Sequence, residues 1–143
     1  RKKFNLLIGE STAEKIKKEI GTAIPTTNNI FLMKGRDIRT GTPKEISLTE
    51  EDACEALMPI LNQMLAAIKE ALESTPPELS ADLVDMGLVL TGGGALLKNI
   101  DKLISKDTGL PVTIADNPLE CVATGTGKAL ENEELFSTML SEY

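Results

Sequence analysis

Apolar positions recur with both strand-like and helix-like spacing along the chain, which predicts an α/β protein. The apolar runs at Leu88–Leu90 and at residues 111–115 are typical of short buried strands. Between them, apolar residues follow helical spacing, and polar residues occupy the opposite side. The apolar series is Leu96, Leu97, Ile100, Leu103 and Ile104. We therefore predict a strand, a glycine turn, a helix that begins directly after Gly94 and ends at Gly109, and a second strand.

The first part of the chain is predicted to combine helices with a small antiparallel sheet. Residues 4–8 have the apolar pattern of a helix that stops at Gly9, and residues 11–14 have the pattern of a capping box for a helix ending at Gly21. Residues 25–48 are predicted to form a meander. Its expected turns are at residues 34–37 and 41–43, with Ile38 in a strand between them.

A long helix is predicted to begin after Thr49, whose side chain suits an N-cap. Pro59 removes one backbone hydrogen bond from this helix, so we expect a kink or break near Met58. We interpret that point as a boundary between two subdomains, residues 1–58 and residues 59–143. Pro76 and Pro77 are expected to end this helix, and a polar link is expected to lead to the strand at Met86.

Two further helices are predicted near the C-terminus. Asn117 suits an N-cap and Pro118 suits the first helical position. Small residues at positions 123, 125, 127 and 129 predict that this helix packs closely against the sheet. A last helix is predicted after Asn132, with these apolar residues: Leu135, Phe136, Met139 and Leu140.

Composition excludes several classes of chemistry. The 143 residues include no histidine and two widely separated cysteines, Cys54 and Cys121, so neither a zinc site nor histidine-dependent catalysis is expected. A net charge of −7 and 3% aromatic residues argue against nucleic acid as a partner. Reduced thiols and the lack of a long apolar segment predict a cytoplasmic protein. Because the chain does not begin with Met, we expect it to be part of a longer protein.

The three glycines Gly92, Gly93 and Gly94 are the strongest candidate for a binding site. They place backbone without side chains between a strand and a helix, where a phosphate or nucleotide sugar can approach closely. The spacing is neither that of the dinucleotide fingerprint nor that of a phosphate loop. The alternative is a turn that needs glycine only for its backbone conformation.

Glu14 and Lys17 are a second candidate, because three residues of separation place them side by side on a helix. The carboxylate can accept hydrogen bonds from ribose hydroxyls, and the lysine stem can cover a base. The alternative is that Glu14 belongs to a capping box on a solvated helix face.

Several segments together resemble one family. Residues 90–101, Leu-Thr-Gly-Gly-Gly-Ala-Leu-Leu-Lys-Asn-Ile-Asp, are similar to the second adenosine motif of the actin, sugar kinase and heat-shock chaperone superfamily. Within that superfamily the chain resembles the MreB/Mbl bacterial actins, as do residues 6–17, 76–79 and 116–130. The resemblance implies the C-terminal lobe of an actin-like ATPase fold, with an incomplete ribonuclease H-like large subdomain and a small α+β subdomain.

The resemblance also implies an ATP site, with Mg in the full-length protein. It places ribose and adenine against Glu14, Lys15, Ile16 and Lys17. It places the other side of the nucleotide against Gly92, Gly93, Gly94, Ala95 and Leu96. The family's Asp-Gly-Thr and Gly-Gly-Gly-Thr phosphate loops do not occur in these residues, so we expect no catalytic residue, no metal ligand and no ATP turnover from this chain alone.

The implied function is that of a cytoskeletal ATPase. Such a protein polymerises with itself into membrane-associated filaments, which act with the cell-wall elongation machinery to control rod shape. One alternative is the nucleotide-binding domain of a heat-shock chaperone. The other is a binding module with no nucleotide role.

Overall fold

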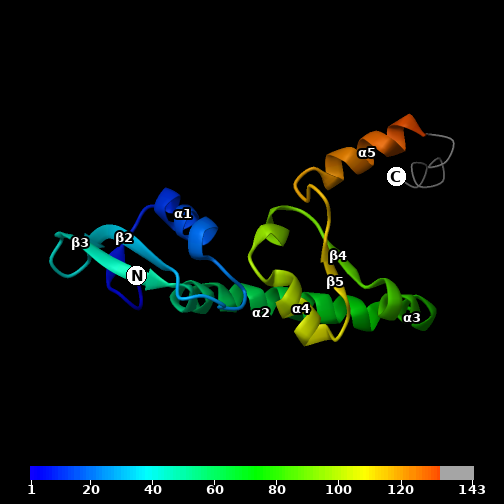
Figure 1. The fold of residues 1–143 in the computed structure, drawn as a ribbon, viewed down its shortest axis with the longest axis horizontal. Coiled ribbons are helices and arrows are strands. Elements are labelled where there is room, and N and C mark those ends of the chain that lie inside the picture. The colour runs from blue at the N-terminus through cyan, green and yellow to red at the C-terminus, as the bar shows by residue number, and fades with distance from the viewer. Residues whose placement is uncertain (133–143) are drawn as a thin grey trace.

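The computed structural model describes residues 1–132, and the helix expected around residues 135–140 lies outside them. The longest element is α2 (Glu50–Ser74), which runs along much of the molecule (Figure 1). The N-terminal sheet lies at the start of α2, and the C-terminal elements lie beside its later turns. The fold is therefore an elongated arrangement of two groups of elements that share one helix.

The N-terminal group is a three-stranded antiparallel sheet in the order β1-β2-β3, packed against α1 (Glu10–Ile20) and α2. The strands are β1 (Leu6–Leu7), β2 (Ile30–Asp37) and β3 (Pro43–Thr49). One face of this sheet is buried, because alternate side chains of a strand point to the same side. The buried cluster consists of Leu6, Ile16, Ile20, Met33, Leu48 and Ala53.

Two predictions for this sheet are wrong. The segment expected to end a helix contains β1 instead, in which Leu6 pairs with Asp37. The turn expected at residues 34–37 is part of β2, and the chain turns after Asp37, whose carboxylate accepts hydrogen bonds from the amides of Arg39 and Thr40. Gly35 allows β1 to lie close, because a Cβ there would be 2.7 Å from the Leu7 carbonyl oxygen. The meander is thus completed by an N-terminal strand, and Ile38 lies in the turn.

The two long N-terminal helices differ in how they begin. No side-chain cap is present on α1, which begins at Glu10, so the capping box expected at residues 11–14 is wrong. The cap of α2 is confirmed: the Asp52 amide donates to the Thr49 hydroxyl at 3.3 Å, and the Thr49 amide donates to the Asp52 carboxylate at 3.0 Å. The break expected near Met58 is absent, because α2 continues through Pro59. Packed clusters hold the helix on both sides of this proline.

The C-terminal group contains a parallel strand pair, β4 (Leu88–Leu90) and β5 (Val112–Ile114), covered by α4 (Ile100–Thr108). Both strands and the stop at Gly109 are confirmed. The segment expected to be a polar link is instead the helix α3 (Pro77–Met86), with Pro77 in its first turn. A second buried cluster joins this group to α2 and contains Ala23, Leu61, Ile100 and Ile104.

The last described helix, α5 (Cys121–Glu131), begins later than expected, because Asn117 adopts a left-handed conformation in the preceding turn. Figure 1 shows α5 projecting away from β4 and β5. No α5 residue is buried among the described residues, and a Cβ on Gly125 or Gly127 would meet nothing within 4 Å. The expected packing of its small residues against the sheet is therefore wrong for this part of the chain.

The two buried clusters occupy successive turns of α2. Ala53 belongs to the first cluster, while Leu57 packs against the second. Ala23 precedes β2 in the chain yet belongs to the second cluster. A subdomain boundary close to Pro59 remains a prediction. With that boundary, Ala23 would belong to the first subdomain by sequence but would pack against residues of the second.

Candidate functional site

The glycine turn follows β4 and leads into a short 3-10 helix, η1 (Gly93–Leu96), rather than directly into α4 as predicted. Gly92 has a φ of +77°, which suits glycine, and its amide donates to the Pro118 carbonyl at 2.7 Å. Ala95 is buried and anchors the turn, whereas Leu96 is largely exposed. The turn is thus held at Gly92 and Ala95.

Gly93 and Gly94 leave bare backbone at the surface of this turn. A Cβ on Gly93 would meet only a Leu119 methyl carbon, at 3.5 Å, and a Cβ on Gly94 would meet nothing within 4 Å. Neither residue has a positive φ, so neither needs glycine for its own backbone conformation. The positive φ at Gly92 supports the purely conformational interpretation for that residue alone.

On α1 the four predicted residues have different surroundings. Glu14 pairs with Lys18 at 2.8 Å, one helical turn away, and this hydrogen bond lowers the pKa of Glu14. Lys15 lies 3.9 Å from Glu19. Ile16 is buried in the first cluster, so its side chain helps to fix the helix in place. Glu14, Lys15 and Lys17 are exposed.

A polar junction that the sequence did not indicate joins the end of α1 to the end of the glycine turn. The Ala23 amide donates to the Lys98 carbonyl at 2.8 Å. The Asn99 side-chain amide donates to the Thr22 hydroxyl at 3.1 Å and to the Ile24 carbonyl at 3.0 Å. Asn99 has a φ of +60°, a conformation that asparagine adopts more readily than most residues.

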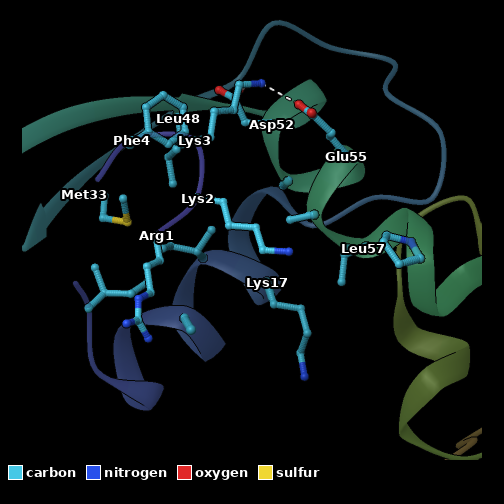
Figure 2. Close-up of a pocket in the computed structure, with 16 residues that line it drawn as sticks. Arg1, Lys2, Lys3, Phe4, Lys17, Met33, Leu48, Asp52, Glu55 and Leu57 are labelled. Atoms are coloured by element: carbon cyan, nitrogen blue, oxygen red, sulfur yellow. Dashed lines mark hydrogen bonds and ion pairs between the residues drawn. The ribbon is translucent and has the colours of Figure 1, made fainter. Parts of the chain in front are cut away.

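A cavity of about 520 Å³ lies between the N-terminal residues, α1 and α2 (Figure 2). Lys17 lines it, whereas none of the glycine-turn residues does. Lys3 closes one side by pairing with Asp52 and Glu55, and these carboxylates raise its pKa. Its apolar lining is Phe4, Ile8, Ala13, Ile16, Met33, Leu48, Ala53, Ala56, Leu57 and Pro59. The predicted α1 residues and the glycine turn therefore do not line one cavity together, and the polar junction is what connects them.

Residues 1–132 contain no group of three or more metal-ligating side chains gathered in one place. None of the helices in this part of the chain has the length and apolar character required to cross a membrane.

Comparison with known sequences finds relatives that are named MreB or Mbl. A profile of the family described as MreB/Mbl protein matches residues 1–138. The cell shape-determining protein Mbl of Bacillus cereus is 49% identical over 133 residues, which cover 92% of this chain and 40% of that protein. The cell shape-determining protein MreB of Haemophilus influenzae is 50% identical over 134 residues, covering 92% and 38%.

Solved structures with a similar fold include an MreB protein. MreB5 of Spiroplasma citri bound to AMPPNP superposes with a TM-score of 0.88 at 36% identity, over 94% of this chain and 40% of that one. A non-polymerising MamK mutant bound to AMPPNP, at 23% identity and a TM-score of 0.60, shows likeness of fold alone. The chain spans about two fifths of the length of the curated relatives it matches. Its fold is part of the actin-like α/β fold, and the chain belongs to the MreB/Mbl family of bacterial shape proteins.

Proposed function

We propose that this chain forms one side of an ATP site in a filament-forming protein that controls cell shape. The observation that carries the proposal is the bare backbone of Gly93 and Gly94, joined through a partly buried polar junction to the helix that bears Glu14 and Lys17. The structures of MreB5 with AMPPNP and with ADP support a nucleotide as the ligand.

The residues fit a nucleoside in a specific way. Gly93 and Gly94 leave room for the sugar or base to lie directly against backbone, because added Cβ atoms would occupy open space. Lys17 has a long apolar stem that can cover a base. Glu14 has a carboxylate that can accept hydrogen bonds from ribose hydroxyls once its solvent-exposed ion pair with Lys18 opens. Ile16 would hold this helix in place from the core. Lys15, Gly92, Ala95 and Leu96 complete the proposed lining.

The wider activity belongs to the complete gene product. We propose that it is an ATPase that binds Mg together with ATP, polymerises with itself in the cytoplasm, and acts at the membrane with the cell-wall elongation machinery. The naming of several relatives as cell shape-determining proteins supports this assignment. A heat-shock chaperone is disfavoured by the same relatives. A module without a nucleotide role remains the competing hypothesis.

Calorimetric titration of the complete gene product with ATP tests the proposal. Gly93→Val and Gly94→Val should each weaken ATP binding by about tenfold or more, since a branched side chain fills the space needed for close approach. Gly9→Val is a matched control, because a Cβ there also meets open surroundings, 4.0 Å from the Ser11 hydroxyl oxygen. A titration of the folded native protein without measurable binding would favour the module with no nucleotide role.

A further inference from the structure

We propose that Thr22 and Asn99 are positioning residues that set the spacing between the two walls of the nucleotide site, which are the glycine turn and α1. The inference rests on the proposed function, and it assigns a role to residues that touch neither the base nor the sugar. Thr22 is completely buried, so its hydroxyl can act only through the protein groups around it.

The hydroxyl of Thr22 is the centre of a small polar network. It lies 2.7 Å from the Ile24 carbonyl and 3.2 Å from the Lys98 carbonyl, and it donates to one of them at a time. It accepts the 3.1 Å hydrogen bond from the Asn99 side chain. Among the described residues, no buried side-chain nitrogen or oxygen lacks a partner, so the buried hydroxyl of Thr22 is satisfied.

Backbone contacts reinforce the same junction. Thr22 and Lys98 form an isolated parallel bridge, next to the bond from the Ala23 amide to the Lys98 carbonyl. The Lys98 ammonium also donates to the Glu19 carbonyl at 2.6 Å, which lies in the last turn of α1. The end of α1 is therefore tied to the residues that immediately follow the glycine turn.

This arrangement restricts how the two walls can move. Glu14 and Lys17 lie on the rigid helix that ends beside Thr22, and Asn99 lies between η1 and α4. A shift of one wall relative to the other would leave buried donors or acceptors without partners, which is costly. A small displacement of binding groups is sufficient to weaken a ligand that contacts both walls.

The test uses ATP titration of the complete gene product carrying Thr22→Val, which keeps the side-chain shape and removes the hydroxyl. We expect about tenfold weaker ATP binding, the size of one net buried hydrogen bond. Thr22→Ser, which keeps the hydroxyl, should restore affinity. Thr108→Val is a matched control, because the Thr108 hydroxyl donates to Ile104 and accepts from the Leu110 amide away from the junction.

A double-mutant cycle separates positioning from general destabilisation. Lys17→Ala should cost less affinity in the Thr22→Val protein than in the native protein, because the displaced wall already contacts the nucleotide poorly. Asn99→Gly is a second variant, which keeps the left-handed backbone accessible and removes the amide. It should weaken ATP binding in the same direction and speed hydrogen exchange at residues 93–97 without nucleotide.

Each outcome is decisive. If native protein binds ATP and Gly93→Val weakens binding, but Thr22→Val binds like Thr108→Val, the positioning role is wrong and the proposed function stands. Additive losses for Lys17→Ala and Thr22→Val would also overturn the positioning role. If the native protein does not bind ATP, the proposed function and this inference both fail.

Discussion

Glu50 holds Thr27 through two hydrogen bonds, one from the Thr27 amide at 3.0 Å and one from its hydroxyl at 2.5 Å. The same carboxylate accepts from the Thr26 amide at 3.1 Å and from the Asn29 side chain at 3.3 Å. Glu50 is the first residue of α2 and is only 2% exposed. One buried carboxylate therefore fastens the loop between α1 and β2 to the start of the longest helix.

Replacing this carboxylate should loosen the loop. Glu50→Ala leaves two backbone amides without their acceptor, so we expect local opening to become easier by about 2 kcal/mol. Hydrogen exchange at Thr26 and Thr27 measures this change. Glu51→Ala is the matched control, because Glu51 is an exposed carboxylate in the same helical turn. Equal exchange rates in both variants would show that Glu50 does not anchor the loop.

The anchor should also depend on pH. The hydrogen bonds from Thr27, Thr26 and Asn29 lower the pKa of Glu50 from 4.5 to about 2. Because the pKa is lower in the folded state, the stabilisation is complete above pH 4.5 and is lost as the pH falls toward 2. Urea unfolding of native protein and Glu50→Gln should therefore differ most near neutral pH and converge across this acidic range. A constant difference would contradict the assigned cause.

Gly87 and Gly109 differ in how strongly they require glycine, because Gly87 has a ψ of −163°, in a region that only glycine readily adopts, whereas Gly109, with a ψ of 3°, is in the left-handed helical region. Both have positive φ, +71° and +75°, but a Cβ on Gly87 would lie 2.3 Å from the Pro111 carbonyl oxygen, whereas one on Gly109 would meet nothing within 4 Å. Gly109→Ala should cost about 1 kcal/mol through strain alone, and Gly87→Ala should cost clearly more. Thermal unfolding of the two variants makes the comparison. Equal losses would contradict this difference.

The proposed subdomain boundary predicts two separable responses. Leu6→Ala removes a side chain from the first buried cluster and Ile104→Ala removes one from the second, and each should cost about 2–5 kcal/mol. If the subdomains open independently, each variant will speed hydrogen exchange mainly in its own cluster. Faster exchange throughout both clusters in either variant would indicate one cooperative unit.

Local signals in the sequence predicted the elements whose causes are local. The Thr49 cap, the stop at Gly109 and the strand at Leu88–Leu90 each depend on neighbouring residues. The strand at Leu6 could not be found this way, because its partner Asp37 is distant in the sequence. Long-range pairing of that kind overrides a helical apolar pattern in a short segment.

Only part of the arrangement around the candidate site could be predicted from the sequence, because the rest depends on side-chain conformations or on residues far apart in the chain. The glycine turn is visible as a motif, and the resemblance that it carries indicates the same family that the MreB/Mbl profile matches. The pairing of Glu14 with Lys18 depends on side-chain rotamers that spacing does not choose between. The junction between Thr22 and Asn99 joins residues far apart in the chain, so no local pattern predicts it.

We propose above all that the glycine turn and α1 contact the same nucleotide. Hydrogen exchange of the complete gene product, measured with and without saturating ATP, tests it most directly. We predict that ATP slows exchange in residues 92–97 and in residues 14–20 together, and that Gly93→Val removes both effects. Bound ATP that protects neither segment would contradict the account.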